Sequence, residues 1–167
     1  DSFRPGQQGI VEALLAGRDV LGVMPTGAGK SVCYQIPAAL SPGMTLVISP
    51  LISLMRDQVD ALNDLGLPAA FINTTQTPDE QAMVFAQAAA GQIKLLYVAP
   101  ERLETGRFRD FAARTPISLI AVDEAHCVSQ WGQDFRSSYL GIGDFIAGLP
   151  QRPPVGAFTA TATERVR

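Results

Sequence analysis

Short apolar runs recur along the chain, and the segments between them carry apolar residues at helical spacing. The runs are rich in Val, Ile and Leu and do not alternate with polar residues, which is typical of strands buried on both faces of a sheet. They are DVLGV (19–23), TLVIS (45–49), AAFIN (69–73), IKLLYVA (93–99), ISLIAV (117–122) and VGAFTA (155–160). We expect each run to form a strand, and the Pro-rich segment 149–154 to be a loop that enters the last one.

Two of the intervening segments show how the helices are expected to form. Residues 51–66 place apolar side chains on one helical face. This face consists of Leu51, Leu54, Met55, Val59, Leu62 and Leu65. The segment TPDEQAMVFAQAAAG begins with the capping-box pair Thr77 and Glu80, has Pro78 at its first helical position and ends at Gly91. The alternation of strands and helices predicts an α/β fold, with a mostly parallel central sheet and helices on both faces.

Length and composition add modest limits. With 167 residues, of which 47% are hydrophobic, the chain has the size of one domain with an ordinary core. Its net charge of −3 gives no indication for or against a nucleic-acid partner. Cys33 and Cys127 lack a CxxC spacing and the chain has a single histidine, so we expect no structural metal site within it. An apolar run of about 20 residues and a leader-like start are both absent from the sequence, so we expect a reducing, cytoplasmic setting.

The segment MPTGAGKS (24–31) lies between a predicted strand and the helical segment VCYQIPAAL, and it has the residues of a phosphate-binding loop. Glycines let consecutive backbone N–H groups face phosphates, a lysine binds the outer phosphates, and a hydroxyl at a helix N-terminus binds magnesium. The predicted nucleotide-binding residues are Thr26, Gly27, Ala28, Gly29, Lys30 and Ser31. The strict pattern has glycine where Met24 stands, so this loop is a variant, and the alternative is a Gly-rich turn with a surface lysine.

A second candidate segment, AVDEAH (121–126), ends a buried strand with carboxylates. Open parallel sheets bind ligands at this edge, so Asp123 is expected to hold magnesium opposite Ser31. Glu124 is the expected base, because it can polarise or deprotonate the water that attacks the terminal phosphate. His126 is expected to couple nearby polar groups rather than to act as the base. The alternative is a solvated surface pair of carboxylates.

A third segment, FTATAT (158–163), places threonines at the end of the last predicted strand. Thr159 and Thr161 could hydrogen-bond the carboxylates of the second segment or His126, and so respond to the nucleotide. Threonines in such positions are also common as helix caps.

Taken in order, FRPGQ, MPTGAGKS, SPLISLMRDQV, YVAPERL, AVDEAHCVSQWGQDFR and FTATAT resemble the motifs of RecQ-family DNA helicases, within helicase superfamily two. The resemblance spans residues 3–163, and the CVSQWGQDFR continuation is similar to RecQ proteins in particular. It implies the first RecA-like motor domain of an ATP- and magnesium-dependent 3′–5′ DNA helicase that acts in repair and recombination. Residues 1–167 are then a fragment of a longer protein, with the second RecA-like domain and the zinc-binding module outside the chain.

The resemblance also implies roles for individual residues. Gln7 is expected to read the adenine edge, since an amide donates and accepts side by side, and Arg4 to pack on the base. Two segments are similar to those that contact single-stranded DNA, and the loop after the DEAH sequence is similar to the family's aromatic-rich loop, whose aromatic side chains can stack on bases. The DNA-binding candidates are Ser49, Ser53, Arg102, Gln130, Trp131, Phe135 and Arg136. For FRPGQ, the alternative is a simple helix-start turn, and for Trp131 it is a core position.

The expected partners are single-stranded DNA, junctions of single- and double-stranded DNA, and the second RecA-like domain of the same protein. That domain supplies the arginines that complete the site, so the fragment alone is expected to be weakly active or inactive. The expected location is the cytoplasm, at the nucleoid, in a bacterium and the nucleus in a eukaryote. Two alternatives remain: an RNA-directed DEAH-box motor and a non-catalytic, nucleotide-gated DNA-binding module.

Overall fold

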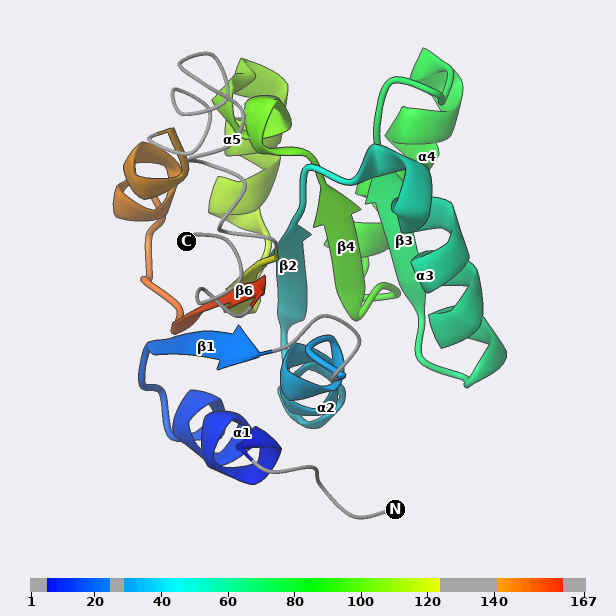
Figure 1. Ribbon diagram of the computed structural model, residues 1–167. Coiled ribbons are helices and arrows are strands. Elements are labelled where there is room, and N and C mark those ends of the chain that lie inside the picture. The colour runs from blue at the N-terminus through cyan, green and yellow to red at the C-terminus, as the bar shows by residue number, and fades with distance from the viewer. Residues whose placement is uncertain (1–5, 25–28, 124–140, 161–167) are drawn as a thin grey trace, which may run out of the picture.

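A computed structural model describes residues 6–24, 29–123 and 141–160 (Figure 1). The helices and strands follow one another in regular alternation through most of the chain. Their order is α1 (Gln7–Leu15), β1 (Val20–Met24), α2 (Val32–Leu40), β2 (Met44–Ile48), α3 (Ile52–Asp64), β3 (Ala69–Ile72), α4 (Pro78–Ala89), β4 (Leu95–Val98), the 3-10 helix η1 (Pro100–Glu104), α5 (Gly106–Arg114), β5 (Ile117–Val122), a helix at 141–147 and β6 (Val155–Ala160). The six predicted strands are confirmed, with ends that differ by two residues at most.

The strands form one parallel sheet in the order β1-β6-β5-β2-β4-β3. Its middle strands are buried on both faces, and all residues of β2 and β4 are buried. Successive side chains of a strand point to opposite faces, so Val47 and Tyr97 pack in one core cluster while Ile48 and Val98 pack in the other. The predicted α/β fold with a parallel sheet is confirmed.

Helices cover both faces of the sheet, as expected (Figure 1). One core cluster joins the sheet to α1, α2 and α3, and the other joins it to α4, η1, α5 and the helix at 141–147. Aromatic rings fill much of the second layer, where Phe108 packs against Phe111 and Phe145 with ring centroids 5.6 and 5.7 Å apart. The result is a three-layer domain with the sheet in the middle.

The predicted start of α4 is confirmed in detail. The Thr77 side chain accepts a hydrogen bond from the Glu80 N–H at 3.1 Å, and the Glu80 carboxylate accepts one from the Thr77 N–H at 2.8 Å. Pro78 is the first helical residue, and the chain turns away at Gly91, whose φ of 79° favours glycine. Local sequence is therefore sufficient to define this helix.

The prediction for α3 is partly wrong. Met55, Val59 and Leu62 form its buried stripe, but Leu54 is 44% exposed and Leu65, just past the helix, is 81% exposed. Only this narrow stripe of α3 faces the core, and the apolar residues beside the stripe face solvent.

The prediction that every strand is buried on both faces is wrong for β1. This strand lies at one edge of the sheet, and Leu21 and Val23 are 69% and 49% exposed. A bidentate ion pair stabilises the start of β1, because Arg152 donates from Nη1 and Nη2 to the two carboxylate oxygens of Asp19 at 3.0 and 2.7 Å.

Among the described helices, none has the length and apolar character needed to span a membrane.

Candidate functional site

The predicted phosphate loop and the predicted magnesium ligand meet at the carboxyl edge of the sheet. Lys30 Nζ lies 3.6 Å from Asp123 Oδ1, and their side chains are only 11% and 9% exposed. Lys30 comes from the turn before α2 and Asp123 directly follows β5, so residues 93 positions apart in the sequence form a buried ion pair. The predicted proximity of these two segments is thereby observed.

The turn before α2 depends on Gly29. Its φ is 79°, a left-handed conformation that side chains other than glycine rarely adopt. A Cβ at this position would lie 2.7 Å from Gln7 Nε2. The Gly29 carbonyl accepts hydrogen bonds from Val32 N at 3.1 Å and from Gln7 Nε2 at 3.1 Å, so it is held both by its own helix and by α1.

The burial of Met24 explains where this turn departs from the strict phosphate-loop pattern. Met24, at the place of the first glycine in the strict pattern, is the last residue of β1 and is buried, with its sulfur 3.8 Å from Cys33 Sγ. Position 24 is therefore a core position in this protein. Ser31 is the N-terminal cap of α2, but its side chain makes no capping hydrogen bond to that helix.

Asp123 is fixed to the sheet through its backbone, because its N–H donates to the Ile48 carbonyl at 2.8 Å. Two fully buried tyrosines lie close to it, Tyr34 from α2 and Tyr97 from β4. Burial raises the pKa of Tyr34 well above its ordinary value, and the negative charge of Asp123 raises it further. Burial likewise raises the pKa of Tyr97, and the charge of Asp123 acts in the same direction.

Tyr34 and Tyr97 pack in one core cluster with Ala121, which lies two residues before Asp123. Neither tyrosine hydroxyl meets the distance and angle requirements of a hydrogen bond with any group in the described parts of the chain. The sequence reasoning missed both tyrosines, because each lies inside an apolar run and has no motif to mark it.

Gln7 has a structural position in this site. It is only 3% exposed, and its amide group faces the Gly29 carbonyl rather than solvent. The predicted role in adenine recognition stays a prediction. The contact with Gly29 was not foreseen, and it links the start of α1 to the phosphate loop.

The described candidates for DNA contact lie at the same edge of the sheet. Ser53 is exposed in the first turn of α3, which follows β2, and Arg102 is half-buried in η1, which follows the neighbouring β4. Ser49 is 5% exposed, and its Oγ accepts a hydrogen bond from Leu51 N at 3.2 Å. Thr159 is half-buried near the end of β6, opposite Val23. Ser53 and Arg102 are thus better placed than Ser49 to contact a bound DNA strand.

The remaining predicted site residues lie outside the described residues, so their roles stay predictions. They are Arg4, Thr26, Gly27, Ala28, Glu124, His126, Gln130, Trp131, Phe135, Arg136 and Thr161.

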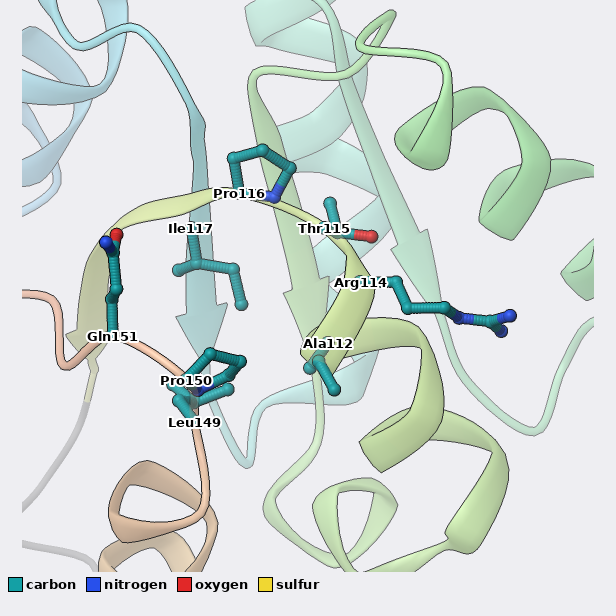
Figure 2. A pocket seen from close by; sticks show the side chains of 9 residues that line it. Ala112, Arg114, Thr115, Pro116, Ile117, Leu149, Pro150 and Gln151 are labelled. Atoms are coloured by element: carbon teal, nitrogen blue, oxygen red, sulfur yellow. The ribbon is translucent and has the colours of Figure 1, made fainter.

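A cavity of about 320 Å³ lies at the opposite edge of the sheet, where β5 and β6 begin (Figure 2). Ile117, Leu149 and Pro150 approach one another in it, whereas the Arg114 side chain points away from them (Figure 2). Because ligands of open parallel sheets bind at the carboxyl edge, this cavity does not belong to the candidate site.

Taken together, the parallel sheet, the glycine turn before α2 and the buried Lys30–Asp123 pair define a P-loop nucleotide-binding domain with the RecA-like α/β architecture. More specifically, the chain belongs to the DEAD/DEAH box helicase family, because the family model matches residues 4–167.

Curated relatives support the same assignment. The chain is 52% identical over 161 residues to the ATP-dependent DNA helicase RecQ of Haemophilus influenzae, a match that covers 96% of this chain and 26% of that protein. It is 49% identical over 166 residues to the RecQ helicase of Pasteurella multocida, covering 99% of this chain and 26% of that protein. The resemblance to RecQ helicases is confirmed, and the chain spans about a quarter of the length of these relatives.

A solved structure agrees at the level of the fold. The crystal structure of the DUF1998 helicase MrfA bound to DNA and AMPPNP matches with a TM-score of 0.77 and 18% identity, covering 96% of this chain and 24% of that chain. At that identity the similarity concerns the architecture alone.

Proposed function

We propose that this chain is the ATP-binding motor domain of a RecQ-like 3′–5′ DNA helicase, in which ATP hydrolysis drives movement on single-stranded DNA and unwinding of duplexes. The observation that carries the proposal is the buried Lys30–Asp123 pair at the carboxyl edge of a parallel sheet. Burying a lysine and a carboxylate is costly, so their burial together at this edge favours a site for a charged ligand, where each group gains a new partner on binding. The similarity to RecQ helicases supports the choice of DNA as the partner.

The residues present fit a magnesium ion. Magnesium prefers oxygen ligands and is commonly held by one or two protein groups together with phosphates. Asp123 supplies a carboxylate, and Ser31 supplies a hydroxyl that is not used to cap α2. The bound ion would neutralise charge on the phosphates.

The chain's own residues would then divide the work. Lys30 would bind the outer phosphates, the glycine turn would present backbone N–H groups to them, and Gln7 would hold that turn through Gly29 while it faces the base. Glu124, next in sequence to Asp123, would orient and deprotonate the attacking water. The second RecA-like domain would complete the site with arginine, worth about 10³–10⁵ in rate by analogy with related ATPases.

DNA would pass over the carboxyl ends of β2 and β4. Ser53 and Arg102 follow these neighbouring strands, and Asp123 follows β5 on the other side of β2. Hydroxyl and guanidinium groups suit phosphate oxygens. A DNA strand bound there would lie one β-strand away from Asp123, which supports coupling of DNA binding to ATP hydrolysis. The protein would act where DNA lies, in the cytoplasm at the nucleoid of a bacterium or in the nucleus of a eukaryote.

The test is ATP turnover by the full-length protein in the presence of single-stranded DNA or RNA of matched length. Stimulation by DNA and not by RNA is expected. Equal or stronger stimulation by RNA would favour an RNA-directed motor, and ATP binding without turnover would favour a non-catalytic module.

A further inference from the structure

In the part of the chain that the structure describes, two buried tyrosine hydroxyls on the same side of the sheet as Asp123 have no hydrogen-bond partner. Tyr34 and Tyr97 are each 0% exposed, and neither hydroxyl is satisfied within the described residues. Leaving a buried hydroxyl unpaired costs the free energy of removing it from water. Natural proteins satisfy most such groups, and the exceptions are frequently tied to function.

The rings themselves are well packed, so the unpaired hydroxyls are not the result of loose structure. The Tyr34 ring packs against Phe158 of β6 with ring centroids 5.5 Å apart, and both tyrosines belong to the cluster between the sheet and α1–α3. A phenylalanine would fill either position equally well. The hydroxyls therefore need an explanation other than packing.

Asp123 is an acceptor on the same side of the sheet as both tyrosines. Tyr34 follows Lys30, the ion-pair partner of Asp123, by four residues, and Tyr97 is joined through Val47 to Ala121, two residues before Asp123. A carboxylate has about four acceptor sites, so it can accept from a tyrosine as well as face Lys30. Tyrosine hydroxyls are protonated at neutral pH and are therefore available as donors.

We propose that Tyr34, supported by Tyr97, is a positioning residue for Asp123. The inference rests on the proposed function. When Lys30 turns from Asp123 to the nucleotide phosphates, the carboxylate gives up its ion pair with Lys30. A small shift then brings the Tyr34 hydroxyl into a hydrogen bond with Asp123, with the Tyr97 hydroxyl behind it. This bond holds the carboxylate in the orientation that magnesium requires.

The proposal gives the two states opposite responses to loss of the hydroxyl. Without nucleotide, the hydroxyl has no hydrogen-bond partner among the described residues, so its removal should not destabilise the fold. In the nucleotide-bound protein it donates to a charged acceptor, so its removal should weaken binding. A purely structural tyrosine would not show this combination.

The experiment compares Tyr34→Phe with wild type in the full-length protein. Binding of a fluorescent ATP analogue, mant-ATP, is titrated with magnesium present and with magnesium removed by chelation, and thermal unfolding is recorded without nucleotide. We expect the affinity with magnesium to fall about tenfold, since a hydrogen bond to a charged group is lost. The affinity without magnesium and the unfolding midpoint should not fall. Tyr97→Phe should act in the same direction and more weakly.

Thr45→Val is the matched control. Thr45 Oγ1 is another unsatisfied buried hydroxyl, but Thr45 pairs with Leu119, four residues before Asp123 in the sequence. At about 3.3 Å per residue this places it roughly 13 Å from the site. Its substitution should change mant-ATP binding in neither condition.

Three results would overturn the inference: wild-type affinity in Tyr34→Phe, an equal loss of affinity with and without magnesium, or a loss accompanied by a lower unfolding midpoint. The proposed function is checked separately by the wild-type protein and Lys30→Ala. If wild type binds mant-ATP and Lys30→Ala does not, the nucleotide site stands even when Tyr34→Phe has no effect. If wild type does not bind mant-ATP, the proposed function fails and the inference fails with it.

Discussion

Lys30 and Asp123 form a buried pair, with Nζ 3.6 Å from Oδ1, that joins the phosphate loop to the end of β5. Because the two side chains come from the second and the fifth of the six motifs, this pair joins distant parts of the chain in one site. It has consequences for stability as well as for binding.

Lys30→Ala should abolish nucleotide binding, because the phosphates lose their cation. It should also lower the free energy of unfolding of the nucleotide-free protein by about 2 kcal/mol, less than the ~3–5 kcal/mol seen for closer buried pairs, since Asp123 loses its cationic neighbour. Isothermal titration with ATP and urea denaturation measure the two effects.

Lys94, the other lysine of the chain, supplies the control. Its Nζ donates to the Ser41 carbonyl, and it directly precedes β4, at the opposite edge of the sheet. Lys94→Ala should leave ATP affinity unchanged. Equal affinities of wild type and Lys30→Ala would refute the assignment of the phosphate loop.

Gly29→Ala should weaken nucleotide binding strongly, because it strains a left-handed residue and places a Cβ 2.7 Å from Gln7 Nε2. Gly66→Ala is a matched control, since Gly66 has a φ of 85° and nothing within 4 Å of its Cβ position. Thermal unfolding should show a larger decrease for Gly29→Ala than for Gly66→Ala, whose cost is about 1–2 kcal/mol.

Adding Gln7→Ala to Gly29→Ala separates the two causes. The double variant should recover the part of the lost thermal stability that arises from contact with the Gln7 amide. It should not recover the part that arises from the left-handed φ of residue 29. If the double variant is no more stable than Gly29→Ala, the close approach of Gln7 to the loop is not a feature of the protein in solution.

Most of the fold could be predicted from the sequence because buried parallel strands have a strong local signature. β5 was predicted with its observed ends, and the capping box of α4 was predicted residue by residue. The burial of individual residues was less predictable. Whether Leu21 or Leu54 is covered depends on sheet order and on helix rotation, which are not local properties.

The candidate site was predictable where it follows motifs and unpredictable where it depends on packing. The motif order placed Lys30 and Asp123 at one edge, and the pair is observed there. The contact of Gln7 with Gly29 and the position of Tyr34 near Asp123 could not be predicted locally. They depend on α1 and α2 packing on the same face of the sheet, the face toward which Ala121 of β5 points. Nothing in the sequence around Tyr34 distinguishes it from an ordinary core tyrosine.

Asp19→Asn should reduce stability in a pH-dependent way. Two hydrogen bonds lower the pKa of Asp19, first that from Arg152 and then that from the Val155 N–H. A lowered carboxyl pKa adds stability that is fully present above the ordinary value of 3.8 and is lost as the pH falls through the lowered value.

Urea denaturation of wild type and Asp19→Asn checks this contribution. The stability difference should be small, because both Asp19 and Arg152 are about half exposed and solvent screens the pair. It should be constant near neutral pH and disappear in strong acid. A difference that grows on acidification would contradict the sign of the pKa shift.

The most direct test of the central claim is steady-state ATP hydrolysis by the full-length protein, with and without single-stranded DNA, in wild type and Glu124→Gln. Glu124 is the residue predicted to activate water, next to the Asp123 that the structure pairs with Lys30. We predict that DNA stimulates hydrolysis by wild type, and that Glu124→Gln binds ATP but hydrolyses it at least about 10²-fold more slowly, as expected for loss of a general base. Equal turnover by the two proteins, or turnover that DNA does not change, would contradict the assignment of this chain as a DNA-dependent motor domain.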